Sequence, residues 1–228
     1  MLSVQCCFAA EELVTTARYA NGEAIPYILN TADAGSQNAP KYVVILFPGG
    51  SGNMDPRLEN GKLAYGFRLN FLIRSRPHIV DGEFATVSTN TTRSEERIQA
   101  VLDDIKRRFP DARIYVMGTS NGTDATRSLA GYLDGRVAGV IHTASLNAIR
   151  GLDTRKYRNR HLFVHHRNDP CFATSFNSVF AAHQEYGTEL IAMEGGVSVG
   201  DRCEAFSYHG FNGIERETME AIKKWIKQ

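Results

Sequence analysis

The chain has 228 residues, of which 26 are Lys or Arg and 25 are Asp or Glu, so its formal net charge is +1. This length suits one domain with a well-buried core and is short for two domains of typical size. The sequence contains no run of like charges that would attract a nucleic acid or an anionic membrane, and we expect neither as a partner. The longest apolar run, 42–47, is far shorter than the roughly 20 residues that span a bilayer, so we expect no membrane span.

The first residues leave two interpretations open. They read MLSVQCCFAA, which is apolar and ends in small residues like the tail of a secretory signal, but which lacks a basic start. Residues 1–12 are therefore either the remnant of a signal peptide or an N-terminal strand, and we expect a single folded domain at 13–228. The first interpretation favours a periplasmic or secreted protein, whereas the second leaves it in the cytoplasm.

The order of strands and helices predicts the fold class. Two β-rich segments, 13–19 and 24–29, flank Asn21-Gly22, a dipeptide typical of hairpin turns. The next strand, 42–47, reads YVVILF without polar alternation, which is typical of a central strand covered on both faces. Beyond it we predict strands at 83–88, 113–117, 137–142, 161–165 and 189–193, and helices at 63–75, 94–109, 121–132, 173–186 and 214–226. This alternation indicates an α/β fold with a mostly parallel central sheet and helices on both faces. In such sheets the reactive loops lie beyond the carboxyl ends of the strands.

Two serines occur in a G-x-S-x-G pattern, which is typical of a nucleophilic serine on a tight turn. Ser120, within GTSNG, follows the predicted strand RIYVM and precedes a predicted helix, which is the context that a nucleophile elbow requires. The flanking glycines give room where the strained backbone would otherwise clash. Ser198, within GVSVG, is followed by a polar loop, so we interpret it as a loop serine and Ser120 as the candidate nucleophile.

A serine hydroxyl is a weak nucleophile until a base takes its proton, and the base needs a partner that fixes its tautomer. Asp169 lies at the carboxyl end of the predicted strand HLFVHH, and His209 lies between the last predicted strand and the final helix. The chain order Ser120, Asp169, His209 matches one of the known orders of a Ser-His-Asp triad. Asp201 is the competing acid, but it lies in the histidine's own loop.

The glycine-rich segment FPGGSG, 47–52, follows the first buried strand. Its backbone N–H groups can turn toward a pocket and stabilise the oxyanion that develops during acyl transfer. We expect the N–H of Asn121, directly after the candidate nucleophile, to be one donor of this oxyanion hole. Gly50 or Ser51 would supply the other.

Over about residues 24–228 the sequence resembles the α/β-hydrolase superfamily. It is most similar to small bacterial serine hydrolases and esterases with an HH..D.C acid loop and a CE..S.HGF histidine loop, matched here by HHRNDPC at 165–171 and CEAFSYHGF at 203–211. The resemblance implies the α/β-hydrolase fold and a triad of Ser120, Asp169 and His209. One position departs from the pattern, because Pro48 stands where a histidine usually precedes the glycines of the oxyanion loop.

Two cysteines lie close in the sequence to the proposed acid and base. If Asp169 and His209 hydrogen-bond, their loops lie side by side, which places the sulfurs of Cys171 and Cys203 within bonding distance. Closing this loop would stabilise the fold by roughly 3–4 kcal/mol in the chain-entropy model. Two reduced, buried thiols are the alternative. A persistent disulfide would favour the periplasm or secretion over the cytoplasm.

The residues predict no metal and no cofactor. His165 and His166 are adjacent on a strand and point to opposite faces, so we interpret them as core or supporting histidines rather than as ligands of one ion. Asp124 is interpreted as a first-turn carboxylate that favours the helix dipole. The glycines at 50–52 lack the third glycine of a dinucleotide motif, and Gly61-Lys62 lies at the wrong distance for a P-loop.

Together these patterns predict a cofactor-independent serine hydrolase that cleaves small-molecule carboxylic esters through an acyl-enzyme. Two alternatives stay open: an acyltransferase or perhydrolase that uses the same triad, and a non-catalytic binding scaffold. The segment between the predicted strands 137–142 and 161–165 is too short for a large cap domain. We therefore expect short loops such as 51–62 to cover the pocket, and a preference for short or moderate acyl groups.

Overall fold

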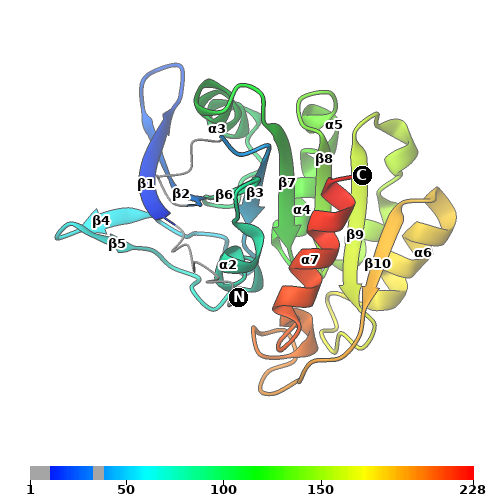
Figure 1. Ribbon diagram of the computed structural model, residues 1–228. Helices are drawn as coiled ribbons and strands as arrows, with labels where there is room; N and C mark the ends of the chain where they lie inside the picture. The colour runs from blue at the N-terminus through cyan, green and yellow to red at the C-terminus, as the bar shows by residue number, and fades with distance from the viewer. Residues whose placement is uncertain (1–10, 33–38) are drawn as a thin grey trace, which may run out of the picture.

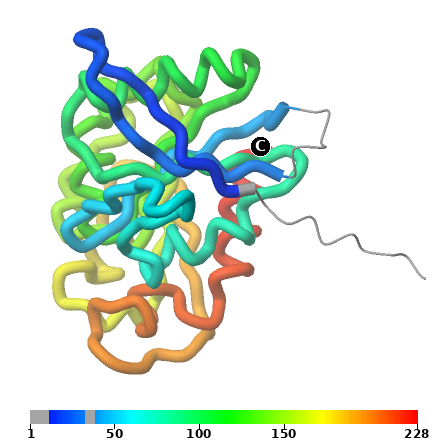
Figure 2. The backbone as a smooth tube through the Cα atoms, turned by 90° about the vertical axis from the view of Figure 1, so that its left-hand side faces the viewer, coloured from blue at the N-terminus to red at the C-terminus, as the bar shows by residue number. Residues whose placement is uncertain are grey.

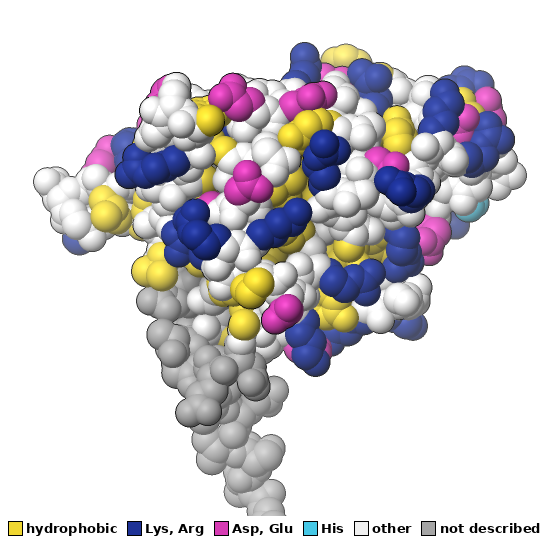
Figure 3. Space-filling view, turned by 90° about the horizontal axis from the view of Figure 1, so that it is seen from above, with side chains coloured by type: hydrophobic (Ala, Val, Ile, Leu, Met, Phe, Trp, Pro, Cys, Tyr) yellow, Lys and Arg dark blue, Asp and Glu magenta, His cyan; other side chains and the backbone are white. Residues whose placement is uncertain are grey.

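The computed structural model of the chain describes residues 11–32 and 39–228. The segment 1–12, interpreted as a signal remnant or as an N-terminal strand, therefore lies almost wholly outside the described residues. Within these residues no helix is both long and apolar enough to cross a membrane. On the face that Figure 3 shows, Lys and Arg side chains are interspersed with Asp and Glu, in keeping with the balanced composition.

A mixed, mostly parallel sheet forms the centre of the molecule, with the strand order β1-β2-β6-β3-β7-β8-β9-β10 (Figure 1). Its strands are β1 (Glu11–Arg18), β2 (Ala24–Thr31), β3 (Tyr42–Phe47), β6 (Phe84–Ser88), β7 (Arg113–Thr119), β8 (Gly139–Thr143), β9 (Arg160–His166) and β10 (Glu189–Met193). The six strands from β6 to β10 in this order pair in parallel, and β1 and β2 form an antiparallel hairpin at one edge. The predicted fold class is confirmed.

Helices cover both faces of this sheet (Figure 1). They are α1 (Phe71–Arg74), α2 (Arg76–Ile79), α3 (Glu95–Arg108), α4 (Gly122–Ser128), α5 (Ala130–Leu133), α6 (Phe176–Tyr186) and α7 (Glu215–Ile226). The strand β3 shows the two-sided burial directly, since Val43 and Ile45 join the core cluster that contains α3, whereas Val44 and Leu46 join the cluster that contains α7. A strand buried on both faces explains why its sequence is apolar at every position.

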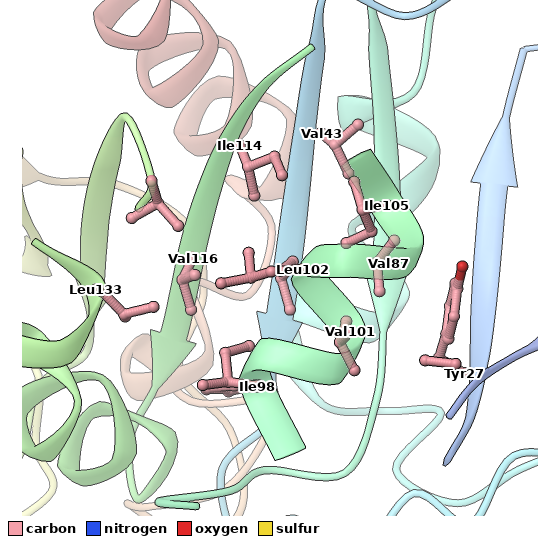
Figure 4. Packing of buried hydrophobic residues seen from close by; sticks show 14 of the residues in the cluster. Tyr27, Val43, Val87, Ile98, Val101, Leu102, Ile105, Ile114, Val116 and Leu133 are labelled. Carbon is pink, nitrogen blue, oxygen red and sulfur yellow. The ribbon is translucent and has the colours of Figure 1, made fainter. Parts of the chain in front are cut away.

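The helix α3 illustrates how local sequence and packing agree. The Ser94 hydroxyl accepts a hydrogen bond from the Arg97 N–H and caps the first turn, where Glu95 and Glu96 also favour the helix dipole. Its buried side chains recur at helical spacing and pack against the sheet, as Figure 4 shows for Ile98, Val101, Leu102 and Ile105. Each such apolar side chain contributes about 1.5–3 kcal/mol on burial.

One predicted helix is largely wrong. The segment 63–75 begins with β5 (Lys62–Ala64), which pairs with β4 (Arg57–Glu59) as a separate hairpin, and only Phe71–Arg74 is helical as α1. Asn60 and Gly61 both adopt left-handed φ angles, of 52° and 74°. This is the geometry of a type I′ turn, and the Asn-Gly dipeptide that favours it outweighed the apolar spacing of the residues that follow.

The loops that follow the parallel strands meet at the lower edge of the sheet in Figure 1. The segment between β8 and β9 holds only two short 3₁₀ turns, Asn147–Gly151 and Thr154–Lys156, so this connection carries no cap domain. Figure 2 shows the loops after β9 and β10, in yellow and orange, at the same end of the molecule. This edge is where the proposed reactive residues lie.

Candidate active site

Ser120 lies on a tight turn between β7 and α4, as expected for a nucleophile elbow. Its φ angle is 51°, a left-handed value that is uncommon for a residue with a side chain. The strained turn is held by its own backbone, because the Ser120 N–H donates to the Thr143 carbonyl at 3.1 Å and the Ser120 carbonyl accepts from the Thr123 N–H at 2.8 Å. The Ser120 hydroxyl is thereby presented at the end of the sheet.

The glycines that flank Ser120 are required by close contacts. A Cβ atom at Gly122 would lie 2.3 Å from the carbonyl oxygen of Phe47, and one at Gly118 would lie 2.5 Å from the carbonyl oxygen of Gly122. Both neighbours are backbone atoms, which cannot move aside without shifting a strand or the turn. The G-x-S-x-G pattern around Ser120 therefore reflects the packing of β3, β7 and α4 against one another.

Asp169 lies in the loop after β9, and its side chain is fully buried. One carboxylate oxygen, Oδ1, accepts from the Cys171 N–H at 2.9 Å. The other, Oδ2, lies 2.9 Å from the Thr174 hydroxyl, 3.0 Å from His209 Nδ1 and 3.2 Å from His165 Nε2. Burial raises the pKa of this carboxyl, but the hydrogen bonds from His165 and His209 outweigh burial and hold the pKa well below its usual range. Asp169 is therefore ionised.

The contact with Asp169 fixes the tautomer of His209. An ionised carboxylate only accepts hydrogen bonds, so the proton between the two groups sits on His209 Nδ1. In the neutral ring this tautomer leaves His209 Nε2 without a proton, which is the form that a general base requires. Ser120 and His209 line the same cavity, although their side chains form no direct hydrogen bond in the described part of the chain. Such bonds often tighten only when a substrate is bound.

The two adjacent histidines of the acid loop support this arrangement from opposite faces of β9. His165 accepts from the Ser145 N–H through Nδ1 at 3.2 Å, so its Nε2 carries the proton that faces Asp169 and the Thr174 carbonyl. His166 donates to the Gly195 carbonyl at 2.9 Å, and its ring stacks on Tyr208 at 4.4 Å between centroids. The interpretation of both as supporting residues agrees with these contacts.

The two expected oxyanion donors, on the glycine-rich loop after β3 and at the elbow, have unpaired backbone N–H groups in the described residues. Within residues 11–32 and 39–228, neither the Gly50 N–H nor the Asn121 N–H donates a hydrogen bond. The two loops are joined, because the Asn121 side chain donates to the Gly50 carbonyl at 3.0 Å. Gly50 and Asn121 line the same cavity as Ser120, whereas Ser51 lines only a neighbouring cavity of about 380 Å³. Of the two expected first donors, only Gly50 lines the cavity that Ser120 lines.

The main cavity has a volume of about 610 Å³. Its walls come from the oxyanion loop, the segment 67–71 before and within α1, the elbow, Leu146, the acid loop at 171–173 and the histidine loop at 203–205 and 209–210. Of the expected covering segment 51–62, no residue lines this cavity. Residues 67–71, which follow the β4-β5 hairpin, line the cavity instead. The longer helix predicted at 63–75 includes these residues.

A disulfide and an arginine fix the histidine loop. Cys171 and Cys203 form the expected disulfide, which ties this loop to the acid loop. Arg74, at the end of α1, donates to the carbonyls of Leu69, Ala205 and Gly210 at 2.6, 2.9 and 2.7 Å. Its guanidinium also pairs with Glu215 at 2.9 Å. The cavity wall at 67–71 and the histidine loop are thus held by one side chain.

A second histidine pair lies away from the cavity. His142 and His161 stack with their ring centroids 5.5 Å apart, and a ring nitrogen of each lies 3.2 Å from the other. Burial lowers the pKa of His161 to about 4 and that of His142 well below its ordinary value. Both rings are therefore neutral near pH 7, and they extend a buried hydrogen-bond chain that starts at Thr126.

Ser198 and Asp201, the alternative nucleophile and acid, do not line the cavity. Ser198 is exposed and accepts only from the Tyr208 N–H, while Asp201 is exposed and accepts from the Cys203 N–H. In the described ranges no group of three or more His, Cys, Asp or Glu side chains is arranged to hold a metal ion. Sequence reasoning missed Thr174, which contacts both Asp169 and His209, because a loop threonine carries no spacing signal.

No family model and no curated protein sequence matches the chain. Solved structures do match it over nearly the full length. A serine hydrolase without a lid from Xanthomonas campestris has 12% identity and a TM-score of 0.60, with 96% of each chain covered. The esterase domain of a Rhodothermus marinus protein has 11% identity and a TM-score of 0.63, covering 94% of this chain and 97% of that one. A Pyrococcus furiosus esterase has 10% identity and a TM-score of 0.64, with 96% and 92% covered. The chain therefore has the α/β-hydrolase fold, in its lidless form.

Proposed function

We propose that this protein is a serine hydrolase that cleaves carboxylic esters through an acyl-enzyme. The observation that carries the proposal is the buried, ionised Asp169 bonded to His209 Nδ1, because His209 lines the same cavity as Ser120, which lies on a left-handed turn. A serine nucleophile needs a base whose tautomer is fixed, and this pairing supplies it. The likeness to solved esterases supports the same chemistry at the level of the fold.

In the proposed reaction the Ser120 Oγ attacks the acyl carbon while His209 Nε2 takes the hydroxyl proton. The negative charge that develops on the carbonyl oxygen is stabilised by the N–H groups of Gly50 and Asn121. His209 then gives its proton to the departing alcohol, and the acyl group remains on Ser120. Water attacks the acyl-enzyme with His209 again as base, which releases the acid and restores the free serine.

The main experiment compares two serines and two acids. We expect Ser120→Ala to abolish ester hydrolysis and labelling by a fluorophosphonate probe, whereas the matched Ser198→Ala variant retains both. Asp169→Asn should lower kcat by about 10⁴-fold, because the wrong tautomer of His209 is then favoured, while Asp201→Asn should have a minor effect. Loss of labelling in Ser198→Ala, or a larger loss in Asp201→Asn, would refute the assignment.

Two further experiments separate this function from its alternatives. A non-catalytic scaffold would neither hydrolyse esters nor react with the probe at Ser120. An acyltransferase or perhydrolase would divert the acyl-enzyme, so adding an alcohol, amine or peroxide would yield the transfer product in place of the free acid.

We also propose a location outside the cytoplasm, because the Cys171–Cys203 disulfide is typical of oxidising compartments. Alkylation of freshly isolated protein before and after reduction tests this location.

A further inference from the structure

Three phenylalanines line the cavity, and the proposed mechanism uses none of them. Phe71 is buried, with its ring centroid 4.4 Å from that of Phe211. Phe172 follows the disulfide cysteine Cys171 and is 87% exposed. Phe67 lies on a different loop and is partly buried against an apolar cluster. Phe172 and Phe67 have no aromatic partner in the described part of the chain, so the Phe172 ring and the part of Phe67 that lines the cavity are available to a ligand.

The exposure of Phe172 does not come from a loosely held loop. Its neighbour Cys171 is fixed by the disulfide to Cys203 and by the N–H bond to Asp169. The Phe172 carbonyl accepts from the Asn147 side chain at 3.0 Å, and the Asn147 N–H donates to the carbonyl of the next residue, Ala173, at 2.9 Å. A backbone held on both sides thus leaves a large apolar ring exposed at the rim of the cavity that Ser120 also lines.

Phe67 shapes the wall beside the proposed oxyanion donor. Its φ angle is 60°, a left-handed value that is strained for a bulky side chain. A Cβ atom at Gly50 would lie 2.8 Å from the Phe67 ring, so the ring packs directly on the oxyanion loop. Backbone strain of this kind clusters at ligand-binding and catalytic positions. Phe67 therefore contributes an aromatic surface close to where a substrate carbonyl would bind.

Resting on the proposed function, we infer that the substrates are esters that carry an aromatic ring on their acyl part, and that Phe172 and Phe67 contact this ring. Aromatic pairs attract one another beyond the burial of area alone, at centroid separations of about 4.5–7 Å. Arg68 and Glu204 also line the cavity and are exposed, so a long alkyl chain would lie against charged groups, whereas polar substituents on a compact ring would suit them. The cavity of about 610 Å³ is of the size that holds small organic ligands.

The test compares esters with equal numbers of acyl carbons. Ethyl phenylacetate and ethyl octanoate each have eight acyl carbons, so their acyl groups are about equal in size. Ethyl acetate measures the reaction without either of these groups. We expect the wild type to show at least about tenfold higher kcat/KM for the phenylacetyl ester than for the octanoyl ester. Phe172→Ala should remove most of this preference, and Phe172→Leu should retain an intermediate preference because it keeps apolar area without the ring.

The matched control is Phe206→Ala, which truncates another exposed phenylalanine that does not line the cavity. It should retain the wild-type preference. An equal preference for the two esters in the wild type, or an unchanged preference in Phe172→Ala, would overturn the inference. Calorimetry with ethyl phenylacetate on Ser120→Ala keeps binding apart from catalysis: binding that Phe172→Ala weakens supports the aromatic site even if hydrolysis is absent and the proposed function fails. If ethyl phenylacetate does not bind and the wild type shows no preference between the two esters, but ethyl acetate is still hydrolysed, the aromatic site is overturned and the proposed function stands.

Discussion

Replacing both cysteines of the disulfide, as Cys171→Ala with Cys203→Ala, should destabilise the protein strongly. The two residues are separated by 32 positions along the chain. In the chain-entropy model, opening a loop of this size costs about 3.7 kcal/mol at 25 °C, because the unfolded chain regains the freedom that the crosslink removed. With an unfolding slope of about 2.5 kcal/mol/M in urea, the midpoint should fall by about 1.5 M.

Equilibrium urea unfolding, followed by tryptophan fluorescence and circular dichroism, measures this shift. Reduction of the wild type with a phosphine should lower its midpoint to nearly that of the double variant, whose own midpoint should not respond to the reductant. This comparison separates the effect of the crosslink from the effect of losing the two sulfur atoms. A shift below about 0.3 M in the double variant would refute the reasoning, since the crosslink would then constrain little of the unfolded chain.

Two further predictions concern single side chains. Thr174→Val removes one donor to Asp169 at nearly constant volume, so kcat should fall about tenfold, equivalent to about 1.4 kcal/mol. The matched Thr188→Val, whose hydroxyl pairs with Thr154 away from the cavity, should leave kcat unchanged, and equal losses in both variants would contradict the proposed role. The depressed pKa of His161, about 4 in the folded state, means that the unfolded chain binds a proton first as the pH falls. The free energy of unfolding should therefore drop between about pH 6.5 and pH 4, and His161 should contribute about 3 kcal/mol of this drop. Urea titrations at several pH values should show a shallower drop for His161→Gln. An identical pH dependence in the two proteins would exclude His161 as a source of the pH effect.

The sequence predicts best where one local pattern serves one structural need. The apolar run of β3 and the glycines around Ser120 are such cases, since burial on both faces and close backbone contacts each demand a particular residue type. The segment 63–75 failed because its apolar spacing suited a helix while the preceding Asn60-Gly61 turn had already committed the chain to a hairpin. Local patterns compete there, and only the tertiary structure decides between them.

The support around Asp169 lies beyond sequence reasoning for a different reason. Thr174 is useful only because the loops after β9 and β10 bring Asp169 and His209 to the same place. Those two residues are 40 positions apart, and no periodicity links either of them to Thr174. The chain order of Ser120, Asp169 and His209 could be predicted, whereas the three donors on one carboxylate oxygen depend on coordinates.

Arg74 has a consequence for how a substrate reaches Ser120. Its guanidinium joins the cavity wall at Leu69 to the histidine loop at Ala205 and Gly210, so these two sides are fixed relative to each other by a single rigid fork. They cannot part to widen the entrance without breaking several hydrogen bonds at once. We therefore expect the width between these two walls to stay fixed when a ligand binds, and a lysine, which offers one ammonium in place of a planar fork, should release that restriction.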